Sequence, residues 1–251
     1  IITGLKGEDV NLYAKWTAID YDITYNLNGG TNHASNPAKY SIETNTITLQ
    51  APTKTGYTFG GYYTVINGGG TQYYNANGGS SKAWNIANNN TLYAKWTANQ
   101  YTINYKDQNN ANFSGSHASG YPTKHTYGTA TTLSTATKTG YTFGGWHTDQ
   151  ACTNKVTSLG ATAYTAAITL YAKWTINQYT LDFGAGEGGS VVAKVKGEAI
   201  KSPATLEHGT SVTLTATPTA DNIFIQWVNE SETMVSTANP YTFNLTANKT
   251  V

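Results

Sequence analysis

The chain has 251 residues, and only 12% of them are charged, about half of the roughly 25% that is usual in globular proteins. Fifteen lysines, no arginine and fourteen acidic residues leave a formal net charge of +1, which argues against the basic surface that nucleic-acid binding needs. One cysteine excludes both an intrachain disulfide and a cysteine-based zinc site.

The first predicted element is a strand over residues 11–17, Asn-Leu-Tyr-Ala-Lys-Trp-Thr. Nearly the same string recurs at 91–97 and 169–175, and its tyrosines stand 80 and 78 residues apart. This interval suits a small domain with its own core better than a solenoid coil. Leu, Ala and Trp alternate with Tyr, Lys and Thr, so we expect the first three to face the core.

A second strand is predicted directly after each copy of this string. Large apolar and polar residues alternate over 21–27, 101–105 and 179–183, which is the period of a half-buried strand. Four residues without Gly or Pro separate each Trp from the Tyr that opens the next strand. Such a linker reaches at most about 13–17 Å, so we expect neighbouring modules to be held end to end with limited bending.

A third element, Lys-Thr-Gly-Tyr-Thr-Phe-Gly-Gly, lies in the middle of each repeat. The first copy, residues 54–62, ends with Tyr62, and the second copy, residues 138–146, ends with Trp146. Residues 222–227 are a divergent counterpart. Between the first of these and the next Leu-Tyr-Ala-Lys-Trp string, residues 67–90 are rich in Gly and Asn. We predict an irregular loop there.

These markers divide the chain into four segments. Residues 1–17 are interpreted as the closing strand of a preceding repeat, 18–97 and 98–175 as two modules, and 176–251 as a divergent module with an incomplete closing strand. Both ends are therefore expected to cut through a repeat. No strong amphipathic helix and no membrane-spanning run are visible, so the expected fold class is β-rich, from all-β to α+β.

The Gly-Tyr-Thr-Phe-Gly-Gly-Trp block and the Thr-Leu-Tyr-Ala-Lys-Trp-Thr string together resemble the Listeria-Bacteroides repeat, also called the internalin B-repeat. Residues 18–97 and 98–175 resemble ordinary members, although Tyr62 replaces the Trp of the block, and 176–251 is similar to the divergent form. The resemblance implies tandem, small β-grasp-like modules in an elongated array. It also implies service in large surface-anchored or secreted bacterial proteins, and hence an extracellular location.

The titratable residues form no pattern typical of catalysis or metal binding. The nearest histidine pair, His117 and His125, is predicted to lie in a solvated loop, and strand alternation points His147 towards solvent. Asp20 and Asp22 share a strand face, but no third ligand with the spacing of a calcium loop accompanies them. We therefore predict a chain without enzymatic activity, cofactor or metal.

Two further features are interpreted as structural. The glycine-rich stretch 184–189 is followed by a β-prone segment and not by a helix, which indicates a hairpin turn in place of a phosphate loop. Cys152 is expected to be a small buried side chain and not a reactive thiol.

Aromatic residues are the candidates for ligand binding. The tryptophans at fixed repeat positions are expected in the cores; these are Trp16, Trp96, Trp146, Trp174 and Trp227. Trp84, Tyr73 and Tyr74 differ, because they lie in the 67–90 loop where no repeat register requires them. Exposed aromatic rings can stack on sugars or anchor a protein partner, so these three residues are the predicted contacts for a host glycan or surface protein.

Three functional hypotheses follow from the sequence. The first is a non-catalytic stalk or spacer and adhesion array of a bacterial surface or secreted protein, monomeric by itself. The second is a glycan- or host-protein-binding module that uses the 67–90 loop. In the third, residues 1–17 of one chain complete the last module of another by strand addition, which would build a head-to-tail fibre.

Overall fold

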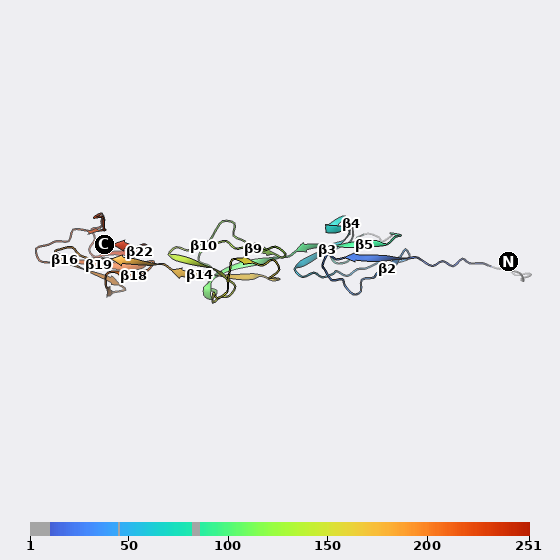
Figure 1. Ribbon diagram of the computed structural model, residues 1–251, viewed down its shortest axis with the longest axis horizontal. Helices are drawn as coiled ribbons and strands as arrows, with labels where there is room; N and C mark the ends of the chain where they lie inside the picture. The colour runs from blue at the N-terminus through green and yellow to red at the C-terminus, as the bar shows by residue number, and fades with distance from the viewer. Residues whose placement is uncertain (1–10, 45, 82–85) are drawn as a thin grey trace, which may run out of the picture. The chain divides into compact units, whose positions relative to one another are not determined.

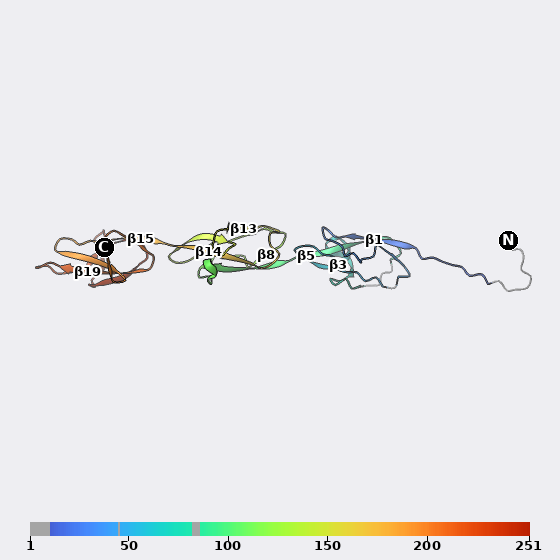
Figure 2. The ribbon, with the colours of Figure 1, turned by 90° about the horizontal axis from the view of Figure 1, so that it is seen from below.

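The computed structural model describes residues 11–44, 46–81 and 86–251. The chain divides into two compact units, one made of the residues up to 100 together with 126–128, the other of residues 101–125 and 129–251. Within the described residues the regular structure consists of β-strands and two short 3-10 turns, without an α-helix (Figures 1 and 2). The predicted β-rich class is confirmed, at its all-β end.

The first module contains a five-stranded sheet of order β2-β1-β5-β3-β4. Its elements are β1 (Asp20–Asn26), β2 (Lys39–Ser41), β3 (Tyr57–Val65), η1 (Ile66–Gly68), β4 (Gly69–Tyr74) and β5 (Asn90–Ala98). Strand β5 carries the Leu-Tyr-Ala-Lys-Trp string and pairs parallel with β1 and antiparallel with β3. The string that closes the repeat in sequence is thus the central strand of the sheet.

The second module repeats this arrangement in a sheet of order β12-β11-β14-β6-β8, with β14 at its centre. Two small sheets, β10-β7 and β13-β9, accompany it. The elements are β6 (Gln100–Asp107), η2 (Gln108–Asn110), β7 (Ser116–His117), β8 (Lys124–Thr126), β9 (Thr131–Thr132), β10 (Ala136–Thr137), β11 (Tyr141–His147), β12 (Lys155–Val156), β13 (Ser158–Leu159) and β14 (Ile168–Ile176).

The third module departs from this plan, because its strands form three sheets, β18-β15-β23, β17-β16-β19-β22 and β20-β21. The elements are β15 (Gln178–Asp182), β16 (Gly189–Val195), β17 (Glu198–Ile200), β18 (Ala204–Glu207), β19 (Thr210–Pro218), β20 (Trp227–Val228), β21 (Met234–Ser236), β22 (Tyr241–Leu245) and β23 (Lys249–Thr250). Each module surrounds its own hydrophobic cluster.

The predicted core face of the central strand is confirmed. Leu170, Ala172 and Trp174 are buried, and in β5 the corresponding Leu and Ala are buried and the Trp half-buried. The prediction is wrong for Trp16, which is 87% exposed. Residues 11–17 have the same alternation but form no strand in the structure, and no sheet of the described residues covers this indole.

The prediction that His147 faces solvent is also wrong. The pairing of β11 with β14 shifts register between Phe143 and Gly145, where Gly145 adopts a φ of +113°. Such a bulge breaks the period-two alternation, so Trp146 and His147, although adjacent, are both buried.

The 67–90 segment is more regular than predicted in its first half. Asn67 and Gly68 have positive φ and turn the chain between β3 and β4, where Val65 pairs with Gly69. Gly and Asn are the residues that tolerate this conformation, so here they mark a hairpin turn and not an irregular loop. Strand β4 follows, and an isolated bridge joins Tyr74 to Ser80.

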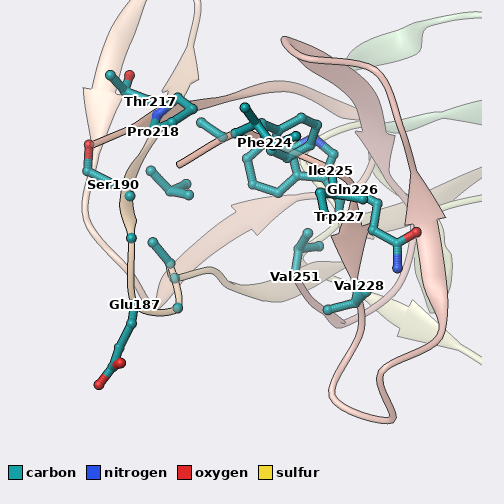
Figure 3. Close-up of a pocket in the computed structure, with 18 residues that line it drawn as sticks. Glu187, Ser190, Thr217, Pro218, Phe224, Ile225, Gln226, Trp227, Val228 and Val251 are labelled. Carbon is teal, nitrogen blue, oxygen red and sulfur yellow. The ribbon is translucent and has the colours of Figure 1, made fainter. Parts of the chain in front are cut away.

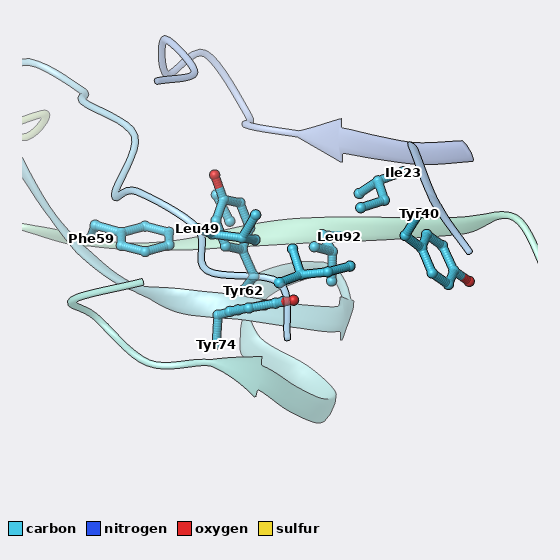
Figure 4. Close-up of a cluster of buried hydrophobic side chains, with 9 residues drawn as sticks. Ile23, Tyr40, Leu49, Phe59, Tyr62, Tyr74 and Leu92 are labelled. Atoms are coloured by element: carbon cyan, nitrogen blue, oxygen red, sulfur yellow. The ribbon is translucent and has the colours of Figure 1, made fainter. Parts of the chain in front are cut away.

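Two tyrosines lie at the centre of the first hydrophobic cluster (Figure 4). Tyr62 and Tyr74 are almost fully buried, with ring centroids 6.3 Å apart in an edge-to-face arrangement. Burial disfavours the charged phenolate; it raises the pKa of Tyr74 to about 12 and that of Tyr62 still further above its ordinary value. Ionisation of either phenol would therefore destabilise the module.

The variant Tyr74→Phe tests this dependence. The neutral phenol of Tyr74 contributes fully below its unfolded pKa near 10, and the contribution is lost as the pH rises towards 12. We expect the free energy of unfolding of the wild type to fall by about 2 kcal/mol more than that of the variant between pH 10 and pH 12. Denaturant titrations at both pH values measure this difference, and parallel losses in the two proteins would contradict it.

Candidate functional site

One residue, Asn177, connects β14 of the second module to β15 of the third. Its N–H donates to the carbonyl of Gly140 over 2.9 Å, and its own carbonyl accepts from the N–H of His208 over 2.8 Å. Its side-chain oxygen accepts from the hydroxyl of Thr142 at 2.7 Å. Residues 140 and 142 belong to the second module and residue 208 to the third, so Asn177 ties the two together.

Asn99 makes the same set of contacts within the first compact unit. Its N–H donates to the carbonyl of Gly56 and its carbonyl accepts from the N–H of Tyr127, both over 2.9 Å. The hydroxyl of Thr58 donates to Asn99 Oδ1 at 2.6 Å. Sequence reasoning missed this role, although Thr-x-Asn-Gln-Tyr follows the Trp at both places and could have revealed it. After 11–17, Ile19 takes the position of the Asn.

A glycine is required at both of these contacts. Gly140 and Gly56 each have a φ of +76°, a conformation that favours glycine. A Cβ on Gly140 would collide with the ring of His208, and one on Gly56 with the ring of Tyr127. The glycine of the Lys-Thr-Gly-Tyr turn therefore serves both to reverse the chain and to let an aromatic ring approach the backbone.

Of the three predicted ligand-binding residues, the structure describes Tyr73 and Tyr74. Tyr74 is 1% exposed in the first hydrophobic cluster, so its ring is not presented to a ligand (Figure 4). Tyr73 is half-buried and packs against the same cluster. Trp84 lies outside the residues that the structure describes. The binding hypothesis for this segment consequently depends on Tyr73 and Trp84.

His117 and His125 have packing roles. The prediction of a solvated loop is wrong for His125, which is fully buried and hydrogen-bonded to Thr131 at 2.8 Å. His117 is stacked between the rings of Phe113 and Tyr121, at centroid distances of 4.3 and 3.9 Å, and burial lowers its pKa. Among residues 11–44, 46–81 and 86–251, no group of three or more His, Cys, Asp or Glu side chains could hold a metal ion.

The remaining polar candidates also have structural partners. Asp107 accepts a hydrogen bond of 2.7 Å from the indole N–H of Trp174. Asp22 is exposed and lies 3.7 Å from Lys39, as expected for a solvated strand face. Cys152 is buried. Within the described part of the chain, none of the helical segments has the length and hydropathy to cross a membrane.

Comparison with known families assigns nearly the whole chain. The family model of the Listeria-Bacteroides repeat domain matches residues 21–95 and 101–173. The model of the divergent InlB B-repeat domain matches residues 179–251. The three matched ranges follow the three hydrophobic clusters.

Curated relatives are considerably longer than this chain. A putative Gly-rich membrane protein of Evansella cellulosilytica is 30% identical over 78% of this chain and 21% of its own length. A putative membrane protein of the same organism is 29% identical over 88% of this chain and 30% of its own length. Internalin H of Listeria monocytogenes is 35% identical over 38% of this chain and 16% of its own length. The chain thus spans less than a third of each of these relatives. No solved structure matches it.

The contact at Gly140 can be tested against a matched glycine. Gly120 has nearly the same φ, +73°, but no atom lies near the position of its Cβ. Both Gly→Ala variants therefore carry a similar backbone strain, of about 1–2 kcal/mol. Only Gly140→Ala should also displace His208 and reduce hydrogen-exchange protection at the amides of Asn177 and His208.

The double variant Gly140→Ala with His208→Ala provides the reverse test. Without the imidazole the added methyl group has room, so protection at Asn177 should return towards that of the wild type. Equal loss of protection in Gly120→Ala and Gly140→Ala would contradict the contact.

Proposed function

Because the chain belongs to the Listeria-Bacteroides repeat family and carries a divergent InlB B-repeat at residues 179–251, we propose that it is a non-catalytic stalk or spacer and adhesion array of a bacterial cell-surface or secreted protein. The similarity to Internalin H and to proteins named as membrane proteins supports a surface repeat region. The finer assignment, to a spacer, comes from the way consecutive modules are joined.

The observation that carries the proposal is the connection through Asn177. A flexible tether would consist of several solvated residues, whereas here one residue lies between β14 and β15. Both of its backbone groups and its side-chain oxygen are hydrogen-bonded to residues on either side. The same arrangement at Asn99 indicates a feature of the repeat. Joints of this kind would restrict bending between consecutive modules, as a spacer requires.

Small-angle scattering tests the spacer role. A single compact domain of this length would have a radius of gyration of about 18 Å. A spacer should give a value well above this at every dilution, with a distance distribution that extends far beyond that of a globule. The variant Gly140→Ala should broaden this distribution by loosening the contact at Asn177. A radius near that of the compact domain would contradict the proposal.

A second candidate function is binding of a glycan or host protein through residues 67–90. It is favoured by Tyr73, which lies on β4 and is only half-buried. Partly exposed tyrosine and tryptophan side chains suit carbohydrate or protein contacts.

A glycan array and pull-downs with host surface proteins test this second candidate. Trp84→Ala should abolish binding and leave the melting temperature unchanged, whereas Tyr73→Ala should abolish binding and also lower the melting temperature, because Tyr73 packs against the buried cluster. Trp16→Ala is the matched control, since it removes an exposed indole outside the segment and should leave binding intact. Silence of the wild type across all ligands would exclude the candidate.

A further inference from the structure

The first module has a polar pocket beside the Trp of its central strand. The pocket has a volume of about 420 Å³, within the range of roughly 300–1,000 Å³ that is usual for small-ligand sites. Its lining includes three threonines, one lysine and two half-buried rings, which are Thr31, Thr53, Thr55, Lys54, Tyr57 and Trp96. All of them belong to the first compact unit.

Lys54 brings its ammonium group to the aromatic wall of this pocket. The ammonium donates to the carbonyl of Asn28 at 2.7 Å. It also stands over the rings of Tyr57 and Trp96, at 4.4 and 5.9 Å from their centroids. Because an ammonium has three N–H donors, a ligand in the pocket can accept a hydrogen bond from it as well.

The matching lysine of the second module has an acidic partner. Lys138 stands over the same two ring positions, at 4.2 and 5.8 Å, but its Nζ also lies 4.0 Å from Oδ2 of Asp107. The indole N–H of the central strand donates to Asp107 in this module and to the carbonyl of Leu27 in the first. Leu27 thus takes the place of the carboxylate, and in the described part of the chain no acidic side chain pairs with Lys54.

The other polar side chains of the pocket are hydroxyls. Thr31 and Thr53 are paired through their backbones, and each N–H donates to the carbonyl of the other, at 2.8 and 3.0 Å. These amides are therefore occupied. Phosphate and sulfate are usually held by arginine or by several converging N–H groups. A single ammonium beside threonine hydroxyls and aromatic rings suits a carboxylate on a hydroxyl-rich ring better.

We propose that this pocket binds a sugar acid, a pyranose ring with a carboxylate, such as a uronic or sialic acid unit of a glycan. The carboxylate would accept from Lys54 Nζ, and the sugar hydroxyls would hydrogen-bond to the threonine hydroxyls. The apolar face of the sugar would pack against Tyr57 and Trp96. The site lies outside residues 67–90 and does not depend on the spacer role, which scattering tests separately.

The chemistry differs in the other two modules. In the second module Asp107 neutralises Lys138, and Trp174 is only 8% exposed. The third module has a hollow of about 310 Å³ beside Phe224 and Trp227 (Figure 3). Its described lining residues include Glu187 and no lysine, so it lacks the cation. We therefore expect one sugar acid to bind per chain.

Calorimetric titration of the whole chain tests the proposal with two acidic probes, trigalacturonate and sialyllactose. Their neutral counterparts are the methyl ester of trigalacturonate and lactose. At least one acidic probe should bind, more weakly as the salt concentration rises, and its neutral counterpart should bind about tenfold more weakly or not at all. The probe that binds identifies the source of the carboxylate. Silence of both acidic probes, or equal binding of an acidic probe and its neutral counterpart, would overturn the proposal.

A pair of lysine variants assigns the charge. Lys54→Gln should weaken binding of the acidic probe by about tenfold or more, because it removes the cation and keeps a side chain of similar length. Lys138→Gln is the matched control, since it removes the corresponding lysine of the second module, and it should bind like the wild type. Equal affinities of the two variants would rule out Lys54 as the contact.

Chemical shifts of the wild type locate the site without any substitution, so the result does not depend on the folding of a variant. The bound acidic probe should shift the indole N–H signal of Trp96 and the amide signals of Thr31 and Thr53. The indole N–H signal of Trp174 should stay in place. Shifts confined to residues of the second or third module would overturn the proposed pocket.

Discussion

The pairing of one strand with two partners determines the architecture of each complete repeat. In the second module, β14 bonds to β6 over Ile168 to Ala172 and to β11 over Tyr171 to Ile176, so it joins the opening and middle segments into one sheet. The first module does the same with β5. In the third module β23 pairs with β15 over two residues, and β15 and β20 lie in separate sheets. The hydrophobic clusters depend on this pairing, because the strand contributes the Leu, Ala and Trp at their centres.

The side chains of this central strand match the residues that they contact in size and in hydrogen bonding. Its alanine faces the largest side chain of the neighbouring strand, since Ala172 pairs with Trp146 and Ala94 with Tyr62. A small residue against a ring fills the interior without overlap, and this also explains why Tyr62 can replace a Trp. The indole N–H of the strand needs an acceptor when it is buried. Asp107 supplies it in one module and the carbonyl of Leu27 in the other.

The sequence allowed the strands and their buried faces to be predicted, because period-two alternation in Leu-Tyr-Ala-Lys-Trp is a local signal. It did not predict that the last strand of a repeat is central, since sheet order depends on long-range pairing. Alternation fails at His147 because a bulge precedes it, and the bulge is visible only with the partner strand present. Residues 67–74 are ambiguous in sequence, because Gly and Asn suit a hairpin turn as well as a loop. Burial of Tyr74 depends on its contact with Tyr62, twelve positions earlier, which no local pattern reports. The roles of Asn99 and Asn177 were detectable in the repeated Thr-x-Asn-Gln-Tyr, but their partners were not.

The parallel pairing of β6 with β14 also has a mechanical consequence. The chain enters the second module at the start of β6 and leaves it at the end of β14, so tension along the chain pulls the two strands in opposite directions. Their hydrogen bonds, from Ile103 paired with Ile168 to Asp107 paired with Ala172, are then loaded in shear and share the force, in contrast to a hairpin that opens one bond at a time. Because these bonds must break together, the second module should resist tension along the chain better than a hairpin with the same number of bonds.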